Sequence, residues 1–149
     1  MWQNADGIFL GQGKYAVEIL KRFGMMDCKA MTTPMASNMK LLSDASSETV
    51  DVTMYCQLMY LTKMRSVICS AVNTLRHVHL IAAKHILRYL RGTVDYGLKY
   101  DANQKINLEG YVDSYWVGSA IDRKNTSGCC FNMGSGVISW FSRKQSCWH

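Results

Sequence analysis

Asp113 is the acidic residue whose surroundings most clearly suggest chemistry. It closes a run from Ile106 in which apolar and polar residues alternate, as they do along a β-strand. A carboxylate can hold a divalent cation, but cleavage of a phosphate by two metal ions needs several carboxylates at nearly fixed positions. Because the rest of such a cluster does not follow before His149, we expect an incomplete site that binds one hydrated Mg²⁺ only weakly.

Basic residues form the second group with chemical potential. The chain carries a net charge of +6 and has a pI of about 9.1, which suits a polyanionic partner. Lys84, Arg88 and Arg91 gather on one side of a predicted helix, and Arg123 and Lys124 lie in a polar loop. Such cations could contact the phosphates of RNA, DNA or an RNA–DNA hybrid, and the ordinary alternative is a solvated basic surface.

Other kinds of site are not indicated by the sequence. It contains no G-x-S-x-G motif, and Gly11–Lys14 is only a fragment of a P-loop. Six cysteines form no CxxC pair, and four histidines complete no zinc spacing, so we expect buried free thiols in a reducing, intracellular compartment. We see no signal peptide, no apolar run that could span a bilayer and no sign of a defined small-molecule ligand, so we expect no membrane partner.

The hydrophobic pattern changes from a helical to a strand period along the chain. Helices are predicted at about 14–23, 53–75 and 78–91, the second capped by Asp51 or Thr53 and the first stopped by Gly24. Strands of an antiparallel sheet are predicted at about 105–115, 126–134 and 136–143, with a hairpin turn at Gly134–Gly136. The fold class is therefore α+β, a helical segment followed by a three-stranded sheet, with a boundary near residues 92–104.

Three blocks of sequence resemble the polyprotein of copia-class long-terminal-repeat retrotransposons. They are KYAVEILKRFGMMDCKAMTTPM at 14–35, HLIAAKHILRYLRGTVDYGLKY at 79–100, and the segment 110–145 with its pattern GY.D..W.GS, DRK.TSG, G.G.ISW.S.KQ. The blocks occur in the family's order and cover nearly the whole chain. The resemblance implies that residues 1–97 correspond to the C-terminal, thumb- or connection-like part of a reverse transcriptase. Residues 98–149 would then correspond to the start of a ribonuclease H-like domain, truncated after its three-stranded sheet.

The resemblance also implies which catalytic residues are missing. The parent family is an RNA-directed DNA polymerase and ribonuclease H that uses Mg²⁺, with a Tyr-x-Asp-Asp hairpin in the polymerase; this sequence has no Asp-Asp pair. Where the family usually has Asp-Ala-Asp-Trp, this chain has Asp113-Ser114-Tyr115-Trp116. Asp113 therefore matches the first carboxylate as a vestigial ligand, and Tyr115 replaces the second.

Three functions remain open at this point. The first is a catalytically inactive segment of a retrotransposon Pol polyprotein, for which we expect no cofactor. The second is a residual or domesticated nucleic-acid-binding module without catalysis. The third, an active nuclease, would need carboxylates from a partner chain. Because the covering helices of a complete ribonuclease H fold would come later, we also expect Val137, Trp140 and Phe141 to pack on the upstream helices or remain exposed.

Overall fold

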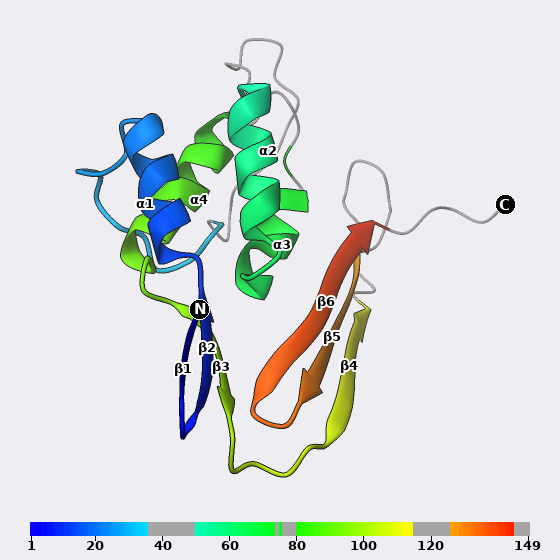
Figure 1. The fold of residues 1–149 in the computed structure, drawn as a ribbon. Coiled ribbons are helices and arrows are strands. Elements are labelled where there is room, and N and C mark those ends of the chain that lie inside the picture. The colour runs from blue at the N-terminus through cyan, green and yellow to red at the C-terminus, as the bar shows by residue number, and fades with distance from the viewer. Residues whose placement is uncertain (36–49, 74, 76–79, 115–125, 145–149) are drawn as a thin grey trace, which may run out of the picture. The chain divides into compact units, whose positions relative to one another are not determined.

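The chain folds into helices and antiparallel strands, which confirms the α+β class (Figure 1). The computed structural model describes residues 1–35, 50–73, 75, 80–114 and 126–144. Two compact units are present: Gly11–Gly97 forms one, and Met1–Leu10 together with Leu98–His149 forms the other. The correspondence of residues 1–97 and 98–149 to two polyprotein domains stays a prediction.

The Gly11–Gly97 unit is helical. It contains α1 (Gly13–Arg22), α2 (Val52–Leu61), α3 (Ser66–Asn73) and α4 (Leu80–Gly92), with α4 packed against α1 and α3, and α2 packed against α3. The predicted apolar faces of these helices form the core, whose largest fully buried side chains are Ile19, Leu20, Val50, Leu58, Leu61, Ile68, Val72, Ile86, Leu87 and Leu90. Removing these side chains from water is the main favourable term for this unit.

The single helix predicted for residues 53–75 is wrong, because a turn separates α2 from α3. The backbone N–H groups of Thr62, Lys63 and Met64 each donate over three residues, at 3.2 Å, and so tighten the chain. The Thr62 hydroxyl donates to the Met59 carbonyl at 2.7 Å, a local bond that competes with helix continuation. The apolar stripe continues across the turn, so hydrophobic periodicity gave no signal for the break.

Helix ends follow local capping chemistry where the sequence supplies it. Asp51 is the N-cap of α2 and accepts a hydrogen bond from the Thr53 N–H at 3.1 Å, as predicted. At the end of α1, the Gly24 N–H donates to the Lys21 carbonyl and the Met25 N–H donates to the Leu20 carbonyl, at 3.2 and 2.8 Å. This pair of bonds is a Schellman motif, which confirms Gly24 as the residue that stops α1.

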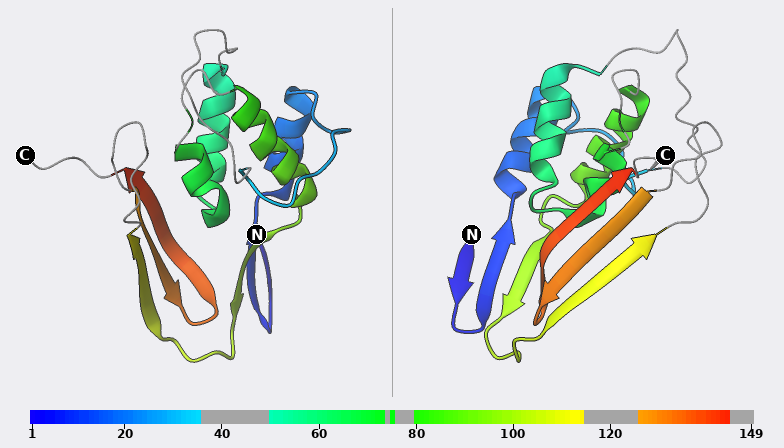
Figure 2. Two further views of the ribbon diagram at one scale, coloured as in Figure 1. Left: turned by 180° about the vertical axis from the view of Figure 1, so that it is seen from behind. Right: turned by 90° about the vertical axis from the view of Figure 1, so that its right-hand side faces the viewer.

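Two antiparallel sheets make up the described part of the other unit. The first has the order β1 (Trp2–Asn4), β2 (Gly7–Gly11) and β3 (Gly97–Asp101), with Trp2 opposite Phe9 (Figure 2). From the sequence alone, the short apolar run Gly7–Leu10 suggests no more than the end of a strand. The Asn4 side chain closes the β1–β2 hairpin by accepting from the N–H groups of Asp6 and Gly7, both at 3.0 Å. A Cβ at Gly7 would lie 2.0 Å from the Tyr100 carbonyl oxygen, so β3 approaches too closely for any side chain there.

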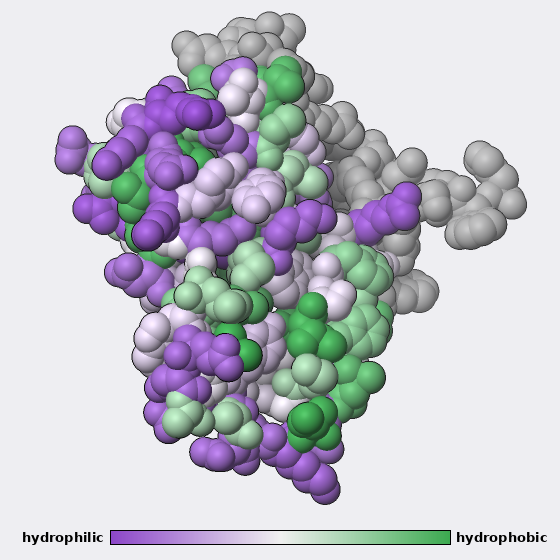
Figure 3. Space-filling model, viewed as in Figure 1, coloured by the Kyte–Doolittle hydropathy of each residue, from purple (hydrophilic) through white to green (hydrophobic). Residues whose placement is uncertain are grey.

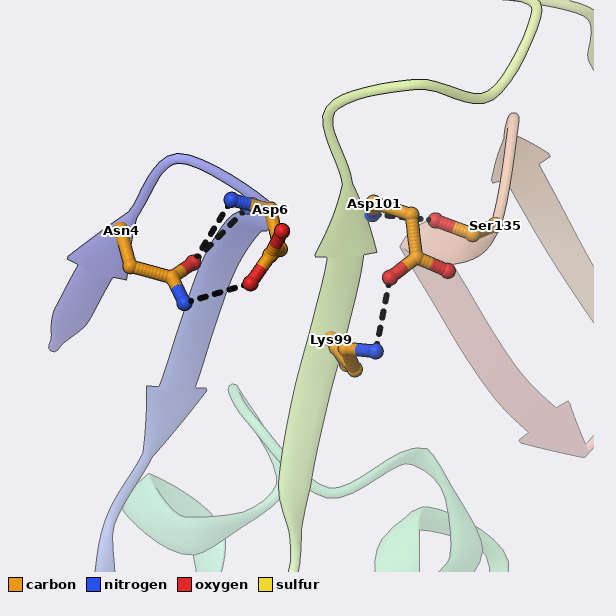
Figure 4. A network of polar contacts seen from close by, with 6 residues as sticks. Asn4, Asp6, Lys99, Asp101 and Ser135 are labelled. Atoms are coloured by element: carbon orange, nitrogen blue, oxygen red, sulfur yellow. Dashed lines mark hydrogen bonds and ion pairs between the residues drawn. The ribbon is translucent and has the colours of Figure 1, made fainter.

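The second sheet has the order β4 (Leu108–Ser114), β5 (Thr126–Met133) and β6 (Gly136–Lys144), as predicted. It contacts the first sheet through a small polar network, in which the Asp101 N–H donates to Ser135 Oγ at 2.7 Å (Figure 4). Lys99 pairs with Asp101 at 2.8 Å, and the hydrogen bond to that carboxylate raises the pKa of Lys99. The Tyr100 hydroxyl also donates to the Val137 carbonyl. The hydrogen bonds of Asp101 with Ser135 and of Tyr100 with Val137 therefore connect β3 to the β5–β6 hairpin.

One face of the second sheet is apolar and open. The strand register places five large apolar side chains on this face, and they are 38–77% exposed: Leu108, Val112, Phe131, Met133 and Phe141. Cys129, between Val112 and Phe141 in the same row, is buried. Hydrophobic residues gather over this sheet in the surface view (Figure 3). Phe141 is thus exposed, whereas Val137 and Trp140 on the opposite face are half-buried.

Gly24→Ala tests the Schellman motif. Gly24 has φ 63°, and an added Cβ would meet nothing within 4 Å, so the cost comes from the backbone alone. We expect the free energy of unfolding to fall by about 1 kcal/mol, measured by urea denaturation. Gly24→Asn, which tolerates the left-handed region better, should cost less. Equal losses for both variants would contradict the backbone explanation.

Lysine substitutions test whether the open apolar face promotes association between molecules of this chain. We expect Val112→Lys and Phe141→Lys to reduce association in sedimentation velocity, because charge on an exposed apolar surface opposes pairing between molecules. Asn107→Lys is the matched control, since it adds the same charge at an exposed polar residue beside β4. Unchanged association in the first two variants, or an equal decrease in the control, would show that this face is not responsible.

Candidate functional site

Asp113 lies near the end of β4, opposite Gly128 on β5, and its side chain is exposed. Alternation along β4 places Glu109 and Tyr111 on the same face of the sheet, and Cys130 lies opposite Tyr111. The predicted strand and the predicted position of Asp113 on it are therefore present. Tyr115 and Trp116 lie outside the described residues.

In the part of the chain that the structure describes, Asp113 has no neighbours that would complete a magnesium site. Among the described residues, no group of three or more His, Cys, Asp or Glu side chains could hold a metal ion. Glu109 is four residues away on the same strand, about 13 Å at roughly 3.3 Å per residue. Its carboxylate also accepts a hydrogen bond from the Tyr111 hydroxyl at 2.7 Å, which raises the pKa of Tyr111. One exposed carboxylate supplies too few of the oxygen ligands that Mg²⁺ needs.

The basic residues predicted on one side of the third helix are exposed on α4. The side chains of Lys84 and Arg88 make no hydrogen bond or ion pair with any residue that the structure describes, so both charges remain available. Arg91 differs, because its Nε donates to the Met26 carbonyl at 2.7 Å. One nitrogen of its guanidinium is therefore already bonded to the backbone of this chain at Met26. Arg123 and Lys124 lie outside the described residues.

Residues 26–33 run along α4 and occupy part of its polar surface. The Met31 N–H donates to the Arg88 carbonyl at 3.2 Å, and His85 Nε2 lies 3.0 Å from the Thr33 carbonyl oxygen. The sequence pattern predicts no helix or strand in this segment and assigns no role to His85. The hydrogen bond between Met31 and Arg88 joins two backbone groups, so the pattern of side chains along the sequence could not predict it. Lys84 and Arg88 are thus the two cations of α4 that are free to meet a ligand.

Positive charge is concentrated in the helical unit. Residues 11–97 contain eleven Lys or Arg and six Asp or Glu, a net charge of +5, whereas the rest of the chain contains six and five. Hydrophilic side chains gather over α1, which carries Lys14, Lys21 and Arg22 (Figure 3). The excess charge is therefore associated with the helices and not with the strand that carries Asp113.

The chain is similar to curated proteins from plants. It is 38% identical to the uncharacterized mitochondrial protein AtMg00810 of Arabidopsis thaliana, over 94% of this chain and 62% of that protein. It is 36% identical to the retrovirus-related Pol polyprotein from transposon RE1 of the same species, over 93% of this chain and 10% of the polyprotein. The corresponding polyprotein from transposon TNT 1-94 of Nicotiana tabacum is 33% identical, over 94% of this chain and 12% of its own length.

The matches cover less than two thirds of these relatives: the chain spans about three fifths of the mitochondrial protein and about a tenth of each polyprotein. No family model and no solved structure matches it. None of the helices in the described ranges combines the length and apolar composition needed to cross a membrane.

Proposed function

Because the chain belongs to the family of retrovirus-related Pol polyproteins of transposons, we propose that it is a copia-class segment of such a polyprotein. Residues 1–97 would correspond to the C-terminal part of the reverse transcriptase and residues 98–149 to the start of the ribonuclease H domain. The three ordered sequence blocks support this assignment. So does a strand order β4-β5-β6 that puts the family's first carboxylate position, Asp113, on the first strand of the sheet.

We propose that this segment is catalytically inactive. The observation that carries the proposal is the isolation of Asp113 from other carboxylates in the described ranges, with Glu109 four residues away on the strand and bonded to Tyr111. The sequence also lacks an Asp-Asp pair for the polymerase reaction. Two-metal chemistry on phosphate needs carboxylates at nearly fixed geometry, and a single exposed Asp does not provide it.

Incubation with an RNA–DNA hybrid tests the loss of catalysis. With Mg²⁺ or Mn²⁺, we expect the purified chain to cleave the RNA strand no faster than a protein-free blank, and Asp113→Asn to behave identically. An active ribonuclease H in the same assay serves as the positive control. Cleavage that disappears in Asp113→Asn would overturn the proposal and favour carboxylates supplied by a second chain.

A second candidate function is binding of nucleic acid without catalysis. It is favoured by the availability of Lys84 and Arg88 on α4 and by the net charge of +5 in residues 11–97. Exposed cations on one helix can contact successive phosphates, and release of counterions then drives binding. The partner would be RNA, DNA or their hybrid, recognised through its backbone and not through its base sequence.

The salt dependence of binding tests this second function. For a short fluorescent RNA–DNA hybrid, we expect the plot of log K against log salt concentration to become flatter by about 2 in the double variant Lys84→Ser, Arg88→Ser. Lys105→Ser, an exposed cation of the other unit, should leave the slope unchanged. Absence of binding at low salt would leave the inactive polyprotein segment as the only function supported.

A further inference from the structure

Arg65 is a charged side chain inside the helical unit. It follows the turn between α2 and α3 and is only 7% exposed. Burial lowers the pKa of its guanidinium, yet arginine remains protonated in proteins. No ion pair links it to a carboxylate in the described residues. A charge in this position is tolerated only if hydrogen bonds replace the lost water.

The turn that follows α4 provides those hydrogen bonds. One terminal nitrogen of Arg65 donates to the carbonyl and the hydroxyl of Thr93, at 2.7 and 3.1 Å. The other donates to the carbonyls of Val94 and Tyr96, at 3.0 and 3.3 Å. All four acceptors belong to residues 93–96, which connect α4 to β3. Only Nε of the guanidinium is buried without a partner in this part of the chain.

The turn 93–96 also contacts α4 and α1. The Tyr96 N–H donates to the Thr93 carbonyl at 3.0 Å, and the Thr93 hydroxyl donates to the Tyr89 carbonyl on α4 at 3.0 Å. Gly13, the first residue of α1, lies against the Val94 carbonyl oxygen. The turn is therefore the place where the start of α1, the α2–α3 junction and the end of α4 meet, and Arg65 bonds to three of its four residues.

We infer that Arg65 fixes the conformation of the turn 93–96 from inside the helical unit and so acts as an internal latch on the end of α4. The donors of a planar guanidinium match the three carbonyls only while the turn keeps this conformation. Opening the turn would leave a buried cation without acceptors, a cost larger than that of losing neutral hydrogen bonds. Because it is buried, Arg65 is separate from the cations of α4 that face solvent, and the inference does not depend on nucleic-acid binding.

Hydrogen exchange of the Tyr96 amide tests the latch. In Arg65→Met, which keeps the length and removes the donors, we expect this amide to exchange on the order of tenfold faster, beyond any change shown by the buried amides of α1. Arg65→Lys should give an intermediate acceleration, because one ammonium cannot replace both terminal nitrogens. Lys63→Met, an exposed cation on the same turn, is the control and should have no effect.

Two results would overturn the inference. One is a Tyr96 amide in Arg65→Met that changes only as much as the α1 amides, which would make Arg65 a general stabilising residue. The other is equal acceleration in Lys63→Met. If Arg65→Met does not fold, Arg65→Lys and Thr93→Ala carry the same comparison, since Thr93→Ala removes one acceptor and should selectively accelerate the same amide. Failure of both to do so would also overturn it.

Discussion

Burial of the helix faces against one another is the interaction on which the rest of this structure depends. Every large side chain that is fully buried in the described residues belongs to the Gly11–Gly97 unit. Each contributes about 1.5–3 kcal/mol relative to exposure, whereas a single backbone hydrogen bond contributes a net 0.5–1.5 kcal/mol or so. The positions of α1, α3 and α4 are therefore set first by apolar contact. That packing then defines where Arg65 finds its acceptors and which side of α4 meets solvent.

The elements with strong periodicity could be predicted from the sequence, and those defined by contacts between distant residues could not. The faces of α1 and α4 and the β4–β5–β6 meander follow from local patterns and from Gly24 and Gly134–Gly136. The break after Leu61 could not be predicted, because the apolar stripe runs through it and a short hydroxyl bond decides the geometry. The β1–β2–β3 sheet could not be predicted, because β3 lies far along the chain from its partner β2. Neither β2 nor β3 has a long alternating pattern.

The candidate site shows the same division. Exposure of Lys84 and Arg88 follows from helical geometry, so the sequence was sufficient for them. The hydrogen bond from Arg91 Nε to the Met26 carbonyl joins residues 65 positions apart in the sequence. The helical pattern of residues 80–92 therefore could not predict it. Asp113 was placed on the correct strand. The hydrogen bond that Tyr111 donates to Glu109, the other carboxylate on that face of β4, is visible only in the structure. The excess positive charge and Asp113 thus belong to different units of the chain.

The open apolar face of the β4–β5–β6 sheet has a thermodynamic consequence. The heat-capacity change on unfolding comes chiefly from apolar surface that is newly hydrated. Leu108, Val112 and Phe141 are already largely hydrated in the folded state, so melting this sheet changes their environment little. In a calorimeter, the curvature of stability with temperature would therefore come almost entirely from the helices. Cooling would weaken the helical packing, while the strand ladders, which are held by backbone bonds, would respond far less.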